Sequence, residues 1–253
     1  MVKIVKTVEE WKGTLNKLED RDSIGFVPTM GALHSGHKSL MKKSIEANKT
    51  TLVSIFVNPT QFNDSDDLKN YPRVIENDID ILNELDVDYL FLPDEKELYP
   101  NGYTYRVNEN NFSRKLCGAH RPGHFDAVLS VVMKLLNIIE PTRAYFGEKD
   151  WQQFKLIDGM VEAFFLKTKI IPCPIIREFD GLALSSRNVL LSEKHRAIAP
   201  EFNRVLMSGK SIDDMKSELI NLGFKVDYIE RYENRILGAV ILGKVRLIDN
   251  VKG

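Results

Sequence analysis

Short apolar runs alternate with longer amphipathic segments through the N-terminal two-thirds of the chain, and this alternation constrains the fold most strongly. Between the runs, apolar residues recur at helical spacing over 74–85 and 128–139, as in helices that pack on a sheet. Strands that alternate with helices predict βα units around a parallel sheet, and therefore the α/β class. Four apolar runs, each followed by a turn signal, are the predicted strands: 24–27, 52–57, 89–92 and 144–146.

The pattern changes near Pro172 and Pro174, where two prolines interrupt an apolar run and a polar, Arg-rich stretch follows. We therefore predict a domain boundary after residue 173, with a first domain over 1–173 and a second over 174–253. The second domain is predicted to be a small α+β unit, with helices over roughly 193–207 and 212–222 and strands around 225–229 and 238–248.

Charge and cysteine content argue against several classes of protein. Lys and Arg total 35 against 36 Asp and Glu, so no long-range field attracts nucleic acid. Cys117 and Cys173 lie far apart, with neither a CxxC pair nor metal-ligand spacing, which suits a reducing compartment. No stretch approaches the roughly 20 apolar residues of a membrane span. We expect a cytoplasmic protein without nucleic-acid or membrane partners, and the cysteines and histidines give no metal-ligand cluster.

The run PTMGALHSGH at 28–37 lies between a predicted strand and a helical segment. Backbone N–H groups at such a helix start are expected to be unpaired, and the helix dipole favours negative charge, so a phosphate can dock there. Gly31 and Gly36 would let the backbone approach a nucleotide, and His34 and His37 can face the same anion. The alternative is that one His caps the helix and the other packs in the core, but this strand-turn-helix context favours the anion site.

Two further stretches could contact phosphates. Lys149, within GEKD at 147–150, can supply a mobile positive charge, and Asp150 can accept from a ribose hydroxyl or hold a cation. The run DGLALSSRN at 180–188 places two hydroxyls beside the Arg187 guanidinium, which suits triphosphate oxygens. Taken alone, the first could be solvated surface and the second a helix cap followed by an exposed Arg.

The run NPTQF at 58–62 follows another predicted strand. Amides at the carboxyl end of a strand lie where open α/β sheets bind ligands. Gln61 could therefore hydrogen-bond a substrate hydroxyl or carboxylate, although a single Gln is more often an ordinary loop residue.

Six motifs taken together resemble the pantothenate synthetase family in order and spacing over nearly all of residues 24–191: PTMGALHSGH, SIFVNPTQF, YPR, RPGHF, FGEKDWQQ and DGLALSSRN. HxGH alone would indicate only the wider nucleotidyltransferase superfamily. The resemblance implies a Rossmann-like N-terminal domain that binds nucleotide and pantoate, a smaller α+β C-terminal lid domain, and a homodimer. It also implies ATP-dependent ligation of pantoate and β-alanine with Mg²⁺, giving pantothenate, AMP and pyrophosphate through a pantoyl adenylate, in pantothenate and coenzyme A biosynthesis.

The same resemblance assigns roles to individual residues. His37, His34 and Lys149 would be catalytic. Gln61 and Gln153 would hold pantoate, and Gln61 would also meet β-alanine. The implied ATP contacts are Met30, Gly31, Ala32, Leu33, His34, Ser35, Gly36, His37, Gly147, Glu148, Lys149, Asp150, Ile176, Leu184, Ser185, Ser186 and Arg187.

Three other functions are compatible with parts of this sequence. A nucleotidyltransferase that acts on a phosphorylated cofactor precursor could share HxGH and a distal phosphate-binding segment. A truncated class I aminoacyl-tRNA synthetase fits less well, because the chain has no room for an anticodon domain and no basic excess. A nucleotide-binding regulator could keep the fold without the reaction, since fold alone does not fix function.

Overall fold

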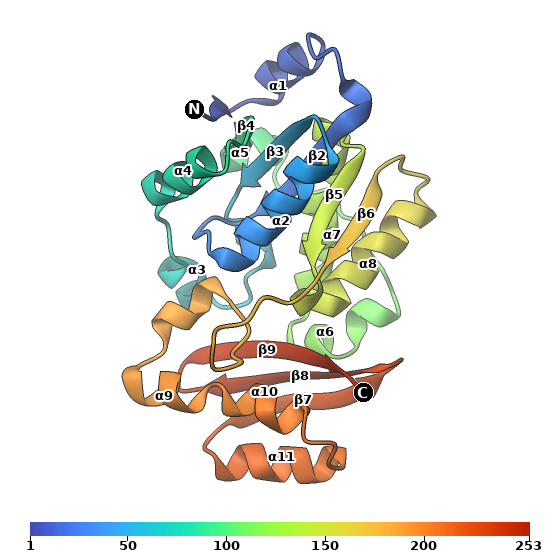
Figure 1. Ribbon diagram of the computed structural model, residues 1–253. Helices are drawn as coiled ribbons and strands as arrows, with labels where there is room; N and C mark the ends of the chain where they lie inside the picture. Colours follow the sequence, from blue (N-terminus) through green and yellow to red (C-terminus); the bar gives the residue numbers. More distant parts are fainter. The chain divides into compact units, whose positions relative to one another are not determined.

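Two groups of strands form separate sheets, and a computed structural model of residues 1–253 divides into two units accordingly (Figure 1). The first unit comprises Met1–Gly147 and Gln152–Cys173. The second comprises Glu148–Trp151 and Pro174–Gly253, so the short segment that contains Lys149 groups with the C-terminal part of the chain.

A six-stranded parallel sheet forms the centre of the first unit. Every residue of β3 is buried, which is expected for a strand covered by helices on both faces. The α/β prediction is confirmed. In spatial order the strands are β1 (Lys3–Val5), β4 (Tyr89–Phe91), β3 (Thr50–Ile55), β2 (Ile24–Thr29), β5 (Arg143–Gly147) and β6 (Lys169–Cys173).

The four predicted strands are β2 to β5, whereas β1 and β6 were not predicted. Strand β1 has three residues, of which only Val5 is buried, so it leaves almost no apolar signal. Strand β6 contains Pro172, which normally argues against a strand. It is tolerated because β6 is at the edge of the sheet, where a missing N–H breaks no inner ladder.

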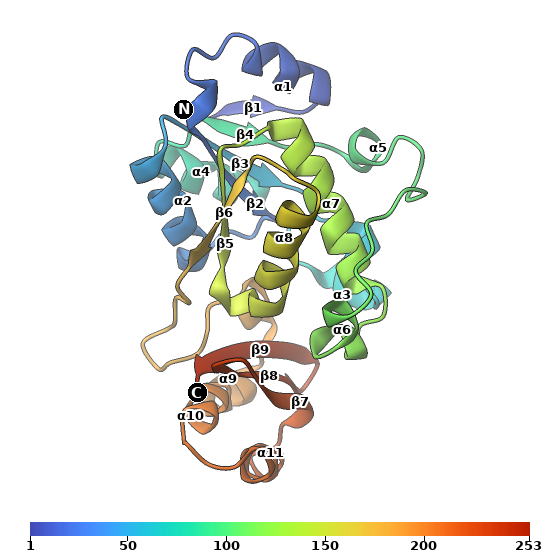
Figure 2. The ribbon, with the colours of Figure 1, turned by 90° about the vertical axis from the view of Figure 1, so that its right-hand side faces the viewer.

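Helices cover both faces of this sheet (Figure 2). The connections from β2 to β3 and from β3 to β4 run one way across the sheet, and those from β4 to β5 and β5 to β6 run the other way. Because such crossovers are right-handed, the two sets of helices lie on opposite faces. Helices α2 (Ser35–Ala47) and α4 (Ile75–Glu84) occupy one face; α1 (Val8–Leu15), α7 (His124–Ile139) and α8 (Trp151–Ala163) occupy the other.

The remaining elements of the first unit are short. They are η1 (Arg21–Ser23), η2 (Pro59–Gln61), α3 (Ser65–Asn70), α5 (Glu95–Leu98), η3 (Phe112–Arg114) and α6 (Cys117–His120). No helix of the chain is long and apolar enough to cross a bilayer.

Helix α2 packs directly on the backbone of β2. A Cβ atom at Gly25 would collide with the Ser44 and Asn48 side chains of α2 and its C-cap, so glycine permits the close approach. The hydroxyl of Ser44 hydrogen-bonds that of Thr51 in β3 at 2.8 Å, and Asn48 Nδ2 donates to the hydroxyl of Tyr145 in β5 at 2.7 Å. These contacts fix α2 across three strands, and with it the start of the helix at residues 34–37.

The second unit holds a three-stranded antiparallel sheet, β7 (Lys225–Tyr232), β8 (Arg235–Leu242) and β9 (Val245–Lys252), coloured red in Figure 1. The predicted strand 238–248 is therefore two strands, joined at Gly243, whose φ of +63° suits a tight turn. The helix predicted over 193–207 is also divided, because Pro200 ends one helix and starts the next. The unit's other elements are η4 (Glu148–Asp150), η5 (Ser186–Leu190), α9 (Glu193–Ile198), α10 (Glu201–Leu206) and α11 (Ile212–Asn221).

Candidate functional site

The carboxyl ends of β2 and β5 mark the point where the direction of the sheet connections reverses. Ligands of open α/β sheets bind at such a switch point. The run 30–37 follows β2, and Gly147 ends β5, so two of the predicted motifs begin at this edge. Gln61 lies in η2, which follows the adjacent strand β3.

The turn after β2 is shaped first by Thr29. Its hydroxyl donates to the Ser54 carbonyl at 2.8 Å and accepts from the Gly31 N–H at 3.1 Å. Gly31 (φ +77°) and Ala32 (φ +50°) then follow in the left-handed region, which is uncommon for alanine. Strain of this kind persists only where surrounding contacts hold it.

Asp78 of α4 provides those contacts. Its two carboxylate oxygens accept from the Ala32 N–H at 2.9 Å and the Leu33 N–H at 2.7 Å, and the residue is only 1% exposed. Burial raises the pKa of the Asp78 carboxyl, and the two backbone hydrogen bonds oppose that rise. A Cβ atom at Gly31 would lie 2.9 Å from Asp78 Oδ2, so glycine leaves room for the carboxylate.

His34 and His37 cap the start of α2 reciprocally. His34 Nδ1 accepts from the Gly36 N–H at 3.1 Å, His37 Nδ1 accepts from the His34 N–H at 3.3 Å, and the ring centroids lie 4.1 Å apart. The expectation of unpaired N–H groups in this turn is therefore wrong for Gly31, Ala32, Leu33, His34 and Gly36. Each of these amides donates to a side chain of the protein instead.

The caps also set the tautomer of both imidazoles. A ring nitrogen that accepts from a backbone N–H carries no proton, so in the neutral ring the proton is on Nε2. Both rings therefore present Nε2–H as a donor, which suits a phosphoryl oxygen.

Gln61 lies beside the first residue of the turn. Its Nε2 is 3.0 Å from Met30 Sδ, and its Oε1 accepts from Asn58 Nδ2 at 3.1 Å. The backbone carbonyl oxygen of Gln61 is contacted by His124 Nδ1 at 2.9 Å and by the Arg121 guanidinium at 3.2 Å. The RPGHF motif thus holds Gln61 in place next to the run 30–37, a role that its sequence alone did not reveal.

The two adjacent glutamines at the start of α8 differ in their surroundings. Gln152 is buried, with Oε1 accepting from the Cys117 N–H and Nε2 donating to the Phe112 and Lys115 carbonyls. Gln153 is half-buried, and successive helical residues point about 100° apart. Gln152 is therefore a packing residue, and Gln153 remains the predicted substrate contact.

The other predicted residues belong to the second unit. Lys149 Nζ is 3.7 Å from Asp150 Oδ2, with the lysine side chain 19% exposed. Ser185 caps η5 by accepting from the Arg187 N–H at 3.3 Å, so the capping interpretation holds for this hydroxyl. The Leu184 N–H donates to the Ile176 carbonyl at 3.0 Å, which brings these two predicted ATP contacts together.

Asp78 was missed at the sequence level, although a signal was present. It lies four residues before the buried Leu82 and next to Ile79, on the apolar face of the predicted helix. A carboxylate in such a stripe needs buried partners. The partners were not evident, because they lie 45 and 46 residues away in the chain.

Replacing Asp78 by Asn should destabilise the protein. The Asn side chain keeps one acceptor oxygen but directs its NH₂ group at the other backbone N–H. That buried N–H then has no acceptor, which lowers the free energy of unfolding by about 1–3 kcal/mol. Urea denaturation at pH 7 measures the loss. Asp80→Asn, an exposed position on the same helix, is the control and should change stability by under ~0.5 kcal/mol. Equal stabilities for the two variants would contradict the role of Asp78.

Known proteins of one family match this chain over nearly its whole length. A profile of the family described as Pantoate-beta-alanine ligase matches residues 3–252. Pantothenate synthetase of Legionella pneumophila (strain Lens) is 49% identical over 249 residues, which are 98% of this chain and 99% of the relative. Pantothenate synthetase of Bdellovibrio bacteriovorus is 48% identical over 252 residues and all of both chains.

Solved structures agree with the sequence relatives. The pantoate-beta-alanine ligase of Francisella tularensis, crystallised with beta-gamma ATP and beta-alanine, matches with a TM-score of 0.96 at 44% identity, covering 100% of this chain and 98% of that one. Pantothenate synthetase from Thermus thermophilus matches with a TM-score of 0.91 at 37% identity, over 99% of each chain. The chain therefore belongs to the pantoate-beta-alanine ligase family.

Proposed function

We propose that this chain joins pantoate to β-alanine at the expense of ATP, giving pantothenate, AMP and pyrophosphate. The observation that carries the proposal is the arrangement after β2, where the His34 and His37 rings lie beside each other at a helix start. Gln61 contacts Met30, so the proposed pantoate ligand is joined to the segment 30–37 that carries the proposed phosphate ligands. Membership of the ligase family supports the assignment.

The first step is attack of the pantoate carboxylate on the α-phosphorus of ATP. The carboxylate is ionised at neutral pH, so this step needs alignment and charge stabilisation rather than a base. His34 and His37 donate through Nε2–H to phosphoryl oxygens, and Lys149 supplies positive charge as negative charge builds on the phosphates. The products are pantoyl adenylate and pyrophosphate.

In the second step the amine of β-alanine attacks the acyl carbon of the adenylate, and AMP leaves. The ammonium of β-alanine loses a proton before it attacks. Water would hydrolyse the adenylate, so we propose that the second unit acts as a lid that protects it.

Mg²⁺ is proposed to enter as the ATP complex. It commonly binds substrate phosphates together with few protein carboxylates. When bound, it would supply positive charge that neutralises the phosphates.

The residues implied by the family motifs form the proposed contact set. Gln61 and Gln153 bind pantoate, and Gln61 also contacts β-alanine. Each unit contributes ATP contacts: residues 30–37 and Gly147 from the first, and residues 148–150, Ile176 and 184–187 from the second.

Substrate omission tests the reaction. Purified protein with ATP, Mg²⁺, pantoate and β-alanine should release AMP and pantothenate, and loss of any one component should stop pantothenate formation. Turnover with a phosphorylated cofactor precursor in place of pantoate, or ATP binding without turnover, would favour the other functions considered above.

Two replacements of His37 separate its cap from its catalytic donor. His37→Asn can still accept the His34 N–H, but its side chain is too short to place a donor where Nε2 is. We expect near-normal stability and a kcat for pyrophosphate–ATP exchange lowered by about 10²-fold or more, the cost of one transition-state donor.

His37→Gln can extend a donor to the Nε2 position but lacks the cap acceptor. It should lose stability by roughly 1 kcal/mol while keeping more exchange activity than His37→Asn. Pantoate-dependent exchange close to wild type in His37→Asn would refute the catalytic assignment.

We also propose a homodimer, as the family resemblance implies. Edge strand β6 leaves one side of its ladder open, and Phe165, at the end of the preceding helix, is 93% exposed. Light scattering should give twice the mass of one chain, and Phe165→Asn, which suits the φ of +56° there, should weaken association. The mass of a single chain at micromolar concentration would contradict the proposal.

A further inference from the structure

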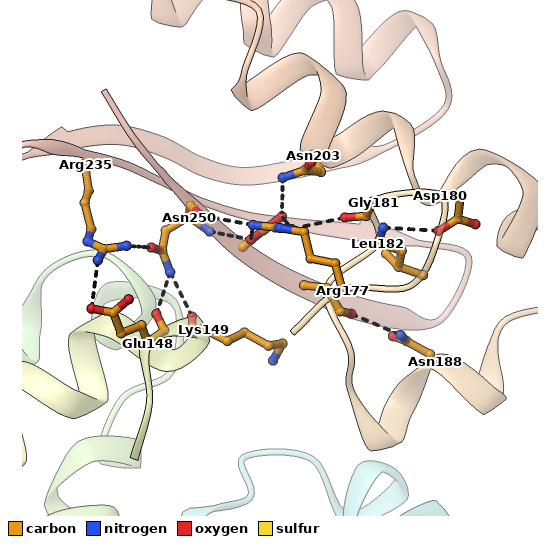
Figure 3. A network of polar contacts seen from close by, with 12 residues as sticks. Glu148, Lys149, Arg177, Asp180, Gly181, Leu182, Asn188, Asn203, Arg235 and Asn250 are labelled. Atoms are coloured by element: carbon orange, nitrogen blue, oxygen red, sulfur yellow. Dashed lines mark hydrogen bonds and ion pairs between the residues drawn. The ribbon is translucent and has the colours of Figure 1, made fainter. Parts of the chain in front are cut away.

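Two consecutive buried residues of β9, Asp249 and Asn250, contact both segments of the second unit that carry proposed phosphate ligands. Figure 3 shows Asn250 beside Glu148 and Lys149, and Arg177 beside Gly181. We infer that this pair positions Lys149 and the loop before Ser185 for the reaction. The inference rests on the proposed function, because it assumes that Lys149 acts on ATP.

Asn250 holds the segment Glu148–Trp151 by its backbone. Its Nδ2 donates to the Glu148 carbonyl at 2.8 Å and to the Lys149 carbonyl at 3.1 Å. Its Oδ1 accepts from Arg235 Nη1 at 2.6 Å, and the residue is only 2% exposed. The amide is therefore oriented by Arg235, with both donors directed at the turn that bears Lys149.

Arg235 supports the same turn at two further points. Its Nη2 lies 3.0 Å from Glu148 Oε1, and its guanidinium carbon lies 3.9 Å from the centre of the Trp151 ring. Stacked on an aromatic face and 6% exposed, this guanidinium is a rigid support. The backbone of Lys149 is thus held on both sides, and the side chain alone is left to adjust to a ligand.

Asp249 holds the other segment through Arg177. Its carboxylate pairs with Arg177 in the bidentate manner, at 2.6 and 2.9 Å, and also accepts from Asn203 Nδ2 at 3.0 Å. Arg177 donates in turn to the Gly181 carbonyl at 3.1 Å. An isolated bridge joins Arg177 to Ala183, so Asp249 fixes the base of the loop that leads into residues 184–187.

The two residues are coupled to each other as well. The Asn250 N–H donates to Asp249 Oδ1 at 2.7 Å, so one strand position orients the next. Buried ion pairs contribute little net stability compared with apolar residues of similar size. Fixing the geometry of two ligand-bearing segments on one strand is a better account of this network than stability.

A double-mutant cycle tests the inference. Asn250→Ala should lower kcat of pyrophosphate–ATP exchange by roughly 10- to 10²-fold, the effect of displacing a catalytic group by about 1 Å. Asn250 is inferred to act through Lys149, and the effects of residues that act as a unit are not additive. In the Lys149→Ala background, Asn250→Ala should therefore lower kcat by a further factor of less than about 3. Thermal stability is measured in parallel, where the same two changes should be additive.

The outcomes distinguish failure of this inference alone from failure of the proposed role of Lys149. If Lys149→Ala exchanges at the wild-type rate, the proposed role of Lys149 fails, and the inference fails with it. If Lys149→Ala is impaired but Asn250→Ala is unchanged, or if the two losses multiply fully, the positioning role is overturned and the proposed function stands.

Two further variants guard against a folding defect. Asn250→Ser keeps a single donor and is used if Asn250→Ala does not fold. It should lower kcat by less than Asn250→Ala is expected to. Asp227→Asn removes the carboxylate charge that pairs with Arg246 at 2.8 Å in the same sheet. It does not touch the turn and should leave kcat unchanged. A loss in Asp227→Asn equal to that in Asn250→Ser would show that general disturbance of the sheet is sufficient, and would overturn the inference.

Discussion

The candidate site depends on the buried carboxylate of Asp78. Its hydrogen bonds to Ala32 and Leu33 hold the chain in the left-handed conformation that carries it from β2 into α2. That conformation brings His34 to the N-cap of α2, where the two imidazoles satisfy backbone donors by Nδ1 and present Nε2–H. A packing constraint in the first unit therefore determines which ring atoms face the proposed phosphate site.

Both units contain a buried polar side chain that binds the backbone of a segment proposed to contact ATP. Asp78 accepts from N–H groups in the first unit, and Asn250 donates to carbonyl groups in the second. Buried polar groups of this kind are costly unless fully hydrogen-bonded, so each of them specifies one geometry. Rigid support of this kind suits a reaction that depends on alignment more than on strong acids or bases.

The sequence predicted the parallel sheet well, because each of the strands β2 to β5 contains a short apolar run between helical segments. Two predictions failed at prolines. Strand β6 was not predicted because it contains Pro172, which an edge strand tolerates, and one helix was predicted across Pro200, where the structure has two. The histidines were identified by spacing. Capping was considered for only one of them, and as an alternative to anion binding, whereas both rings cap the helix. Asp78 and Asn250 were missed because their partners lie 46 and 101 residues away, beyond any local pattern.

The central claim is that pantoate is activated by attack of its carboxylate on the α-phosphorus of ATP. Pantoate labelled with ¹⁸O in its carboxylate provides the most direct measurement, because the C–O bond broken in the second step leaves one of these oxygens on the nucleotide. Mass spectrometry of the products should find one ¹⁸O in AMP for each pantothenate formed. Unlabelled AMP, or label in inorganic phosphate released together with ADP, would contradict the account.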